Sequence, residues 1–228
     1  MPRFTTEEIT RATGASVSGG NGITFADVTT DTRAVVQGAL FIALKGERFN
    51  GEDFLKEAQE AGAAGVLVSN ACGEEKTEGL TLSVFRVPDP LRAYQQIAHA
   101  HRERFSLPVV AITGSNGKTT TKDLTASVLG ASFPVLRTEA NFNNEIGLPK
   151  TLLGLRDEHK AAVVEIGMRG LGQIEALAPI AAPTVGVVTN VGETHIELLG
   201  SIENIAKAKA RTCAARKSCR TAWNRASS

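Results

Sequence analysis

The strongest local signal in the sequence is Val109-Val110-Ala111-Ile112-Thr113-Gly114-Ser115-Asn116-Gly117-Lys118-Thr119-Thr120. An apolar run typical of a buried strand enters a short loop with two glycines, and Lys-Thr then opens a helical pattern. Glycines let backbone N–H groups turn inward onto phosphate oxygens, and a helix N-terminus adds partial positive charge. The segment therefore predicts a phosphate-binding P-loop of the short form G-x-x-G-K-T, because Ile112 stands where the strict Walker pattern has glycine. The alternative is a glycine-rich turn with an incidental Lys-Thr.

The members of this loop have separate expected roles. We expect Lys118 to place a point charge on the β and γ phosphates, and the Thr119 hydroxyl to bind Mg²⁺. The glycines and the start of the helix supply backbone N–H groups. The predicted nucleotide-binding set is Gly114, Ser115, Asn116, Gly117, Lys118, Thr119 and Thr120.

The residues around the loop alternate between strand and helix patterns. Pro88-Asp89-Pro90 marks a boundary, and an amphipathic helix is predicted over 91–105, with His99 and His101 at its surface. The alternation indicates βαβ units, hence a mostly parallel, doubly wound sheet in a central domain, 87–210. The pattern is still running where the chain ends, so this domain is expected to be incomplete. The predicted strands are 107–113, 134–137, 161–166 and 184–190, and the predicted helices are 118–130, 145–153, 172–178 and 201–210.

Residues 1–86 read as a separate, small α/β domain. Thr5 and Glu8 form a capping-box pattern at the start of a short helix that Gly14 ends. Two polar loops each lie next to an apolar strand pattern in this domain. The loops are 29–33 and 45–51, the predicted strands include 23–28, 65–69 and 82–87, and a helix is predicted over 52–61.

The composition narrows the class of protein. The 228 residues include 25 Lys+Arg against 24 Asp+Glu and are 42% hydrophobic, which fits a globular protein with a substantial core. The near-zero net charge argues against a dedicated nucleic-acid binder. No apolar run reaches the roughly 18 residues that span a bilayer, and the N-terminus lacks a signal-peptide core. Three cysteines form no even framework, so a reducing cytoplasm is the expected compartment, with no membrane or nucleic-acid partner.

The last segment, 211–228, differs from the rest. It holds five basic residues and no acid, together with two of the three cysteines and the only tryptophan. A basic arm that binds nucleic acid is one interpretation. The interpretation we favour is a foreign or out-of-frame segment that follows Ala210, so that the chain is a truncated product.

Three further segments carry polar groups suited to a nucleotide site. Glu165 lies inside an apolar strand pattern, where burial of its charge costs several kcal/mol unless a cation such as Mg²⁺ compensates. His195 follows the strand predicted at 184–190, on the rim where α/β sheets bind ligands. The alternative for both residues is a solvated side chain. Asn141, Asn143 and Asn144 could position oxygens of a ligand, or they could cap and turn the chain.

Taken together, these motifs resemble those of the Mur ligase family of peptidoglycan synthesis. The resemblance covers residues 1 to about 210, and several ordered motifs are far more specific than the P-loop alone. The matching segments are Asp31-Thr32-Arg33, 38–51, 114–123, 141–149, Glu165-Ile166-Gly167-Met168-Arg169-Gly170 and 189–195.

The resemblance implies two ligand sites and a set of site residues. The N-terminal domain would hold the UDP end of a nucleotide-sugar peptide through Thr32, Arg33, Lys45 and Arg48. The central domain would bind MgATP, with one Mg²⁺ on Thr119 and Glu165 and a second on Glu165 and His195. A carbamylated lysine near the second metal would be Lys209, with Lys207 as the nearby alternative. The implied catalytic set is Lys118, Glu165, His195 and Lys209.

The implied activity is ATP-dependent amide formation in peptidoglycan precursor synthesis. The 141–149 motif favours the type of ligase that joins D-alanyl-D-alanine to UDP-N-acetylmuramoyl-tripeptide through an acyl phosphate. The protein is expected to be a monomer. Another ligase of the family that adds a single amino acid is one alternative, and a non-catalytic nucleotide-binding module is another. The family carries a third, C-terminal domain that this chain lacks, so the chain itself is expected to be inactive.

Overall fold

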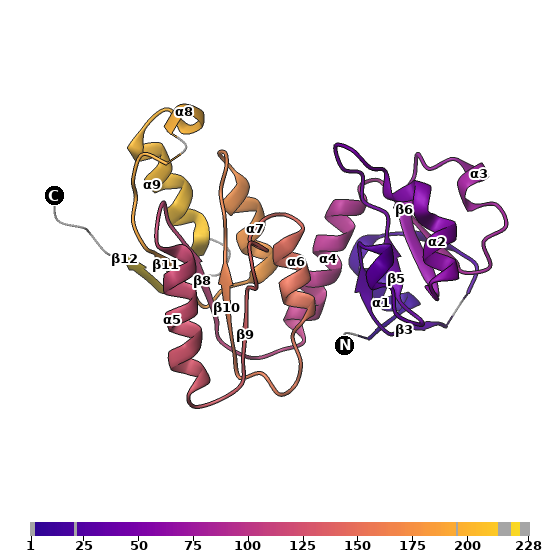
Figure 1. Ribbon diagram of the computed structural model, residues 1–228, viewed down its shortest axis with the longest axis horizontal. Helices are drawn as coiled ribbons and strands as arrows, with labels where there is room; N and C mark the ends of the chain where they lie inside the picture. Colours follow the sequence, from indigo (N-terminus) through magenta and orange to yellow (C-terminus); the bar gives the residue numbers. More distant parts are fainter. Residues whose placement is uncertain (1–2, 21, 195, 214–219, 224–228) are drawn as a thin grey trace. The chain divides into compact units, whose positions relative to one another are not determined.

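The computed structural model describes residues 3–20, 22–194, 196–213 and 220–223. The chain divides into two compact units, Met1–Ala100 and His101–Ser228 (Figure 1). The division falls inside helix α4 (Pro90–Glu103), some way beyond the Pro88-Asp89-Pro90 boundary predicted from the sequence.

The first unit is built on a five-stranded sheet of order β2-β7-β6-β5-β4. The β4–β5, β5–β6 and β6–β7 pairs are parallel, and β2 runs antiparallel to β7. A separate antiparallel pair joins β1 to β3. The elements are β1 (Phe4–Thr5), α1 (Thr6–Thr13), β2 (Ser16–Ser18), β3 (Thr24–Phe25), β4 (Val28–Thr29), η1 (Thr32–Ala34), β5 (Leu40–Ile42), η2 (Gly51–Phe54), α2 (Leu55–Glu60), β6 (Gly65–Ser69), α3 (Glu74–Thr77) and β7 (Ser83–Val87).

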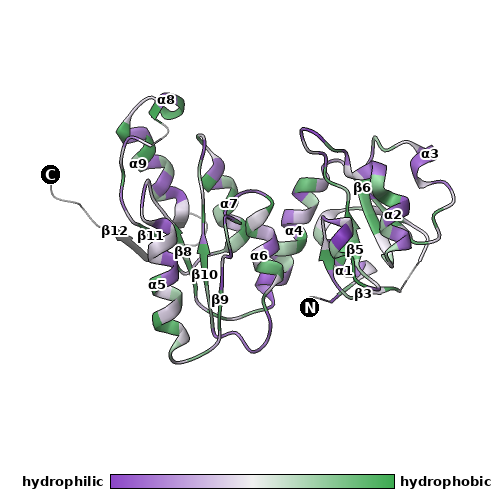
Figure 2. Ribbon diagram, in the orientation of Figure 1, coloured by the Kyte–Doolittle hydropathy of each residue, from purple (hydrophilic) through white to green (hydrophobic). Residues whose placement is uncertain are grey.

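Local sequence explains how this unit begins and how it packs. The capping box is confirmed, since the Glu8 backbone N–H donates to Thr5 Oγ1 and the Glu8 carboxylate accepts from the Thr5 backbone. Gly14 ends α1 with a φ of 69°. In the core, the rings of Phe25 and Phe85 meet edge to face with centroids 5.6 Å apart. Figure 2 shows the hydrophobic colour concentrated on the sheet strands, β6 among them.

The second unit is an all-parallel five-stranded sheet of order β12-β11-β8-β10-β9. This confirms the prediction of a mostly parallel α/β fold around the P-loop strand. The segment after Ala210 contributes the edge strand β12 through its backbone pairing with β11. The elements are β8 (Val109–Thr113), α5 (Lys118–Gly130), β9 (Val135–Arg137), α6 (Gly147–Leu153), β10 (Ala161–Glu165), α7 (Gln173–Ala181), β11 (Val185–Val188), α8 (Ile196–Leu199), α9 (Ile202–Ala210), η3 (Arg211–Cys213) and β12 (Arg220–Trp223).

Helices cover both faces of this sheet. Ile112 and Val163 pack with Ala126 of α5 on one face. Because strand side chains alternate, the buried Val109 and Val164 point to the opposite face, which α6 and α7 cover (Figure 1). P-loop residues therefore emerge from the middle of the sheet, with strand ends on both sides of them.

One surface prediction is wrong. His101 is 3% exposed, because its Nε2 lies 3.0 Å from the Leu155 carbonyl oxygen and its ring meets Phe105 edge to face. Burial lowers the pKa of His101. Across the described residues, no helix combines the length and the apolar character needed to span a bilayer.

Candidate active site

The P-loop has the backbone conformation that its two glycines permit. Gly114 has a φ of 151° and Gly117 a φ of 77°, values that residues with a Cβ rarely adopt. A Cβ on Gly114 would also overlap the Thr189 hydroxyl. The first glycine is therefore required both by its conformation and by the close approach of a neighbouring strand end.

The start of helix α5 is left open for an anion. Gly117 is its N-cap and offers no capping side chain, so the first-turn N–H groups have no side-chain acceptor. The Lys118 ammonium folds over the loop, 2.9 Å from the Gly114 carbonyl oxygen and 3.3 Å from that of Ser115. Thr120 is exposed in the same turn. N–H groups and an ammonium thus converge at one end of a 13-residue helix, which is the chemistry of a phosphate site.

The end of strand β11 fastens the outer half of the loop. Asn190 Oδ1 accepts from the backbone N–H groups of Ser115 and Asn116, at 3.1 and 2.9 Å. The Thr189 hydroxyl donates to the Asn116 carbonyl oxygen at 2.6 Å. The Ser115 hydroxyl donates to the Gly192 carbonyl and accepts from the Gly192 N–H, at 3.1 and 2.9 Å. Three residues at and after the end of β11, namely Thr189, Asn190 and Gly192, therefore hold the loop in place.

Glu165 stands at the end of strand β10 with both carboxylate oxygens bonded. It is 3% exposed, and Thr119 Oγ1 donates to its Oε2 at 3.0 Å. Asn143 Nδ2 donates to Glu165 Oε1 at 2.8 Å. The backbone N–H of Glu165 donates to the buried Thr138 hydroxyl at 3.0 Å. The structure thus brings together Thr119 and Glu165, the two side chains predicted to share a cation.

The lysines predicted near the second metal lie in different environments. Lys209 is 2% exposed, whereas Lys207 is on the surface of α9. Burial, together with the nearby charge of Lys118, lowers the pKa of Lys209 to about 8. Of the two lysines left open by the sequence, Lys209 is the one whose pKa is influenced by the P-loop residue Lys118. His195 lies outside the described residues.

The predicted residues of the first unit lie in two loops at one rim of its sheet. Thr32 and Arg33 follow β4, Lys45 and Arg48 follow β5, and these strands are parallel neighbours. Arg33 pairs with Asp31 through Nη2 and Oδ2 at 2.7 Å, and Thr32 Oγ1 donates to Glu57 Oε1 at 2.5 Å. Arg33, Lys45 and Arg48 are exposed, so three cations line this rim.

The donor set fits a Mg²⁺–nucleotide complex. A threonine hydroxyl and a carboxylate are oxygen ligands, which Mg²⁺ prefers, and it usually keeps water and phosphate oxygens as further ligands. Among the described residues, which omit position 195, no three His, Cys, Asp or Glu side chains gather into a metal cluster. The Thr113 hydroxyl, buried at the end of β8 beside the loop, also has no hydrogen-bond partner in the described part of the chain. A site completed by phosphate oxygens and water agrees with both observations.

Several residues of this site were not singled out from the sequence. The contacts of Thr138, Thr189 and Asn190 join segments at least 27 residues apart. Asn143 belonged to an amide run that sequence alone left between ligand binding and capping. Asn144 Oδ1 accepts from the Gly147 N–H at 2.8 Å at the start of α6, in agreement with the capping interpretation, and Asn143 contacts Glu165. Ligand binding by these amides stays a prediction.

The fold and the loop first define a P-loop nucleotide-binding α/β protein. Residues 112–222 match the Mur ligase middle domain, and residues 24–102 match the Mur ligase family catalytic domain. The chain belongs to the Mur ligase family, as its motifs predicted. The middle-domain match runs past Ala210 into the segment predicted to be foreign.

The chain is similar to ligases of one type within the family. It is 52% identical over 185 residues to UDP-N-acetylmuramoyl-tripeptide–D-alanyl-D-alanine ligase of Synechocystis, covering 80% of this chain and 40% of that protein. A crystal structure of MurF from Acinetobacter baumannii matches with a TM-score of 0.85 and 31% identity, covering 93% of this chain and 46% of that one. MurF of Thermotoga maritima in complex with ADP matches with a TM-score of 0.75 and 32% identity, over 84% and 43% of the two chains. The chain thus spans less than half the length of these relatives.

Proposed function

We propose that this chain carries the nucleotide-binding and UDP-substrate-binding parts of a ligase that joins D-alanyl-D-alanine to UDP-N-acetylmuramoyl-tripeptide. The observation that carries the proposal is the hydrogen bond between Thr119 and Glu165. It lies next to the P-loop lysine, at the start of helix α5, which has no side-chain cap. The names of the relatives supply the substrates. Another ligase of the family that adds a single amino acid has no comparable support.

The residues of the second unit have distinct proposed roles toward MgATP. Gly117 and the start of α5 bind the phosphates through N–H groups, and Lys118 neutralises charge on the transferring phosphoryl group. Ser115 and Asn116, whose N–H groups bond to Asn190, shape the loop around the phosphates. Thr119 and Glu165 hold Mg²⁺, which supplies further charge neutralisation when bound. Asn143 and Thr138 keep Glu165 oriented. His195 and Lys209 are proposed for the second metal, Lys209 as a carbamate.

The proposed reaction has two steps, phosphoryl transfer to the tripeptide carboxylate and amide formation. A tripeptide carboxylate oxygen attacks the γ-phosphorus of ATP, and the bond between that phosphorus and the β,γ-bridging oxygen breaks. ADP departs, and the tripeptide carboxylate has become an acyl phosphate. The amine of D-alanyl-D-alanine then attacks the acyl carbon, phosphate leaves, and the nitrogen loses a proton as the amide forms. Such chemistry needs positioning and charge neutralisation more than covalent help from the protein.

The first unit is proposed to bind the UDP end of the substrate. Arg33, Lys45 and Arg48 offer cations to a diphosphate at one sheet rim, and Thr32 offers a hydroxyl. A monomer that acts in the cytoplasm and binds neither nucleic acid nor membrane stays our prediction. The formal net charge of +1 supports the expectation that the chain does not bind nucleic acid.

Calorimetry on the chain as it stands tests the proposal. MgADP and UDP-N-acetylmuramoyl-tripeptide are titrated separately, and each is expected to bind. Thr119→Val and Glu165→Gln should weaken MgADP binding and leave the UDP ligand unchanged, because they alter only the proposed metal ligands. If both variants bind MgADP as the parent chain does, the proposed metal site is wrong.

A further inference from the structure

The two oxygens of the Glu165 carboxylate have different partners. Oε2 accepts from the Thr119 hydroxyl at 3.0 Å, and that hydroxyl oxygen is itself suited to share a cation. Oε1 accepts from the Asn143 side-chain amide at 2.8 Å, so the positive end of an N–H dipole occupies the place of a cation there. Burial of Glu165 and its backbone hydrogen bond to Thr138 restrict rotation of the carboxylate. The oxygen that Glu165 offers to a cation is therefore Oε2.

Asn143 is held in this position through its backbone as well as its side chain. Its carbonyl oxygen accepts from the Gly167 N–H at 2.8 Å, and its own N–H donates to the Asn141 carbonyl at 2.7 Å. A Cβ on Gly167 would lie 3.0 Å from Asn143 Oδ1, so glycine is the residue that leaves room for the amide. A segment before α6 and a segment after β10 thus converge on the amide that bonds to Oε1.

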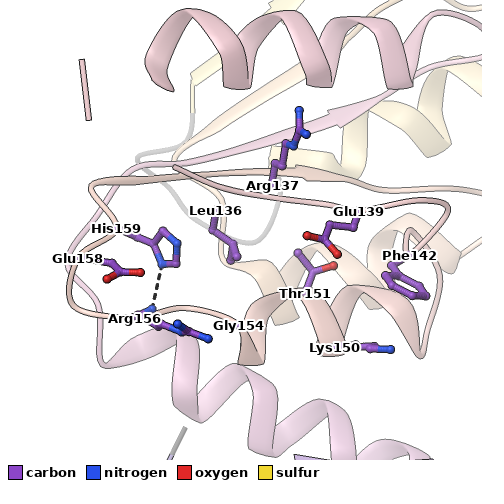
Figure 3. Close-up of a pocket in the computed structure, with 10 residues that line it drawn as sticks. All are labelled: Leu136, Arg137, Glu139, Phe142, Lys150, Thr151, Gly154, Arg156, Glu158 and His159. Carbon is purple, nitrogen blue, oxygen red and sulfur yellow. Dashed lines mark hydrogen bonds between the residues drawn. The ribbon is translucent and has the colours of Figure 1, made fainter. Parts of the chain in front are cut away.

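The turn that precedes Asn143 is strained. Glu139 and Phe142 are its ends, and the Phe142 N–H donates to the Glu139 carbonyl at 3.1 Å. Ala140 within it has a φ of 45°, a conformation that alanine rarely adopts. The Lys150 ammonium lies over the Phe142 ring, 4.5 Å from the centroid (Figure 3). Strain of this kind persists where the surrounding structure holds it, and it clusters at functional sites.

A carboxylate that offers one oxygen does not suit all divalent cations equally. Mg²⁺ is small, takes six ligands at about 2.0–2.1 Å and keeps several water molecules. Ca²⁺ takes about six to eight oxygen ligands at about 2.3–2.6 Å, and carboxylates often bind it through both oxygens. With Oε1 occupied by the Asn143 amide, Glu165 is restricted to binding a cation through one oxygen.

We propose that Asn143 sets the cation preference of the nucleotide site: by occupying Oε1, it leaves Glu165 a single oxygen and favours Mg²⁺ over Ca²⁺. Asn143 is thus a positioning residue, which acts on the cation through Glu165. The inference rests on the proposed function, because it requires that Thr119 and Glu165 hold the cation of a bound nucleotide. It gives Asn143 a role distinct from the ligand binding and the capping considered from the sequence.

Calorimetric titration of the chain with ADP, in saturating Mg²⁺, in saturating Ca²⁺ and in EDTA, tests the inference. We expect the parent chain to bind ADP about tenfold more tightly with Mg²⁺ than with Ca²⁺. Asn143→Leu removes the N–H donor and keeps a side chain of similar shape, so Oε1 becomes available. The ratio of the two affinities should fall about tenfold, the worth of one hydrogen bond to a charged group. Gly167→Ala displaces the amide without removing it, and the ratio should fall about threefold, a partial loss of the same bond.

Asn204→Leu is the matched control, because Asn204 Nδ2 makes a hydrogen bond of the same length, 2.8 Å, to the Leu199 carbonyl. It should leave the ratio unchanged. Melting temperatures of all variants identify a damaged fold, which lowers the affinity with both cations and leaves their ratio.

Two kinds of failure are distinguishable. If ADP binds equally well with Mg²⁺ and in EDTA, the proposed metal site is wrong, and this inference with it. If Mg²⁺ strengthens ADP binding, the inference alone is overturned by a parent chain without preference over Ca²⁺, by an Asn143→Leu variant that keeps the parent's ratio, or by an Asn204→Leu variant that lowers the ratio as much.

Discussion

The two candidate ligand sites differ in how far the protein builds them in advance. In the second unit, Asn190, Thr189 and Gly192 fasten the P-loop, and Thr119, Asn143 and Thr138 fasten Glu165. In the first unit, Arg33 has an 86% exposed side chain that pairs with its neighbour Asp31, and Phe49 is 71% exposed. One site is held by long-range hydrogen bonds within the protein, and the other presents exposed side chains that a ligand would have to order.

This difference has an energetic meaning. Ordering a loop costs conformational entropy, and the second unit bears that cost during folding rather than on binding. Substitutions in its site should therefore affect stability and ligand affinity together. Substitutions in the rim loops of the first unit should affect affinity alone.

The greatest loss is expected for Lys118→Met. The variant removes the ammonium that folds over the loop and keeps a side chain of similar length. Loss of charge-assisted bonds to phosphate should weaken MgADP binding about 100-fold. Calorimetry measures this, with the exposed Lys160→Met as the matched control. Equal MgADP affinities of the two variants would mean that the loop does not bind phosphate.

Asn190→Ala tests whether the loop is built in advance. Its Oδ1 accepts two loop N–H groups, so removal should lower the free energy of unfolding by about 1–2 kcal/mol. MgADP affinity should fall about tenfold, because the ligand must now order the loop. Chemical denaturation and calorimetry on the same variant give the two numbers. A loss of affinity with unchanged stability would count against the contrast.

The sequence predicts elements that local residues define, and it misses features that depend on long-range contacts. Helix α5 has the predicted bounds 118–130, because the glycine loop before it and Gly130 at its end mark these bounds locally. The strand predicted at 23–28 is divided into β3 and β4, because the intervening backbone bonds to residues at and just before the start of β5. The Ala26 N–H donates to the Gly38 carbonyl at 2.9 Å, and the Leu40 N–H donates to the Asp27 carbonyl at 2.8 Å. No local pattern carries that information.

The candidate site shows the same division. Glu165 could be selected because a carboxylate within an apolar strand needs a compensating charge. Asn190 and Thr138 could not, since an amide or a hydroxyl in a loop is equally suited to capping and turns. Their contacts join segments that are far apart in the sequence. The same is true of the contact between the buried His101 and the Leu155 carbonyl. The roles of Lys118, Glu165, His195 and Lys209 in catalysis stay predictions.

A smaller effect, on stability alone, is expected from Lys209→Met. The folded state lowers the pKa of this lysine from 10.5 to about 8, so below pH 8 folding buries a charge. Between these values the unfolded chain binds more protons, and the stability of the parent chain rises with pH. The variant lacks the penalty, so its gain in melting temperature should be clear at pH 7 and shrink above pH 8.

Melting curves from pH 6 to 10, in buffer freed of bicarbonate, measure that gain. Lys207→Met is the control, because it makes the same substitution at an exposed lysine of the same helix. A gain for Lys209→Met that is constant across the range would show that the lysine is not charged when buried.

The smallest effect is expected at the rim of the first unit. Arg33→Ala removes an exposed cation whose partner Asp31 is also partly exposed, so the melting temperature should not change measurably. If the rim binds the diphosphate of a UDP ligand, affinity should fall about threefold, as suits a solvated ion pair. Salt should reduce the parent chain's affinity more than the variant's, since screening acts on exposed charges. A drop in melting temperature like that of Asn190→Ala would show that this rim, too, is built before its ligand arrives.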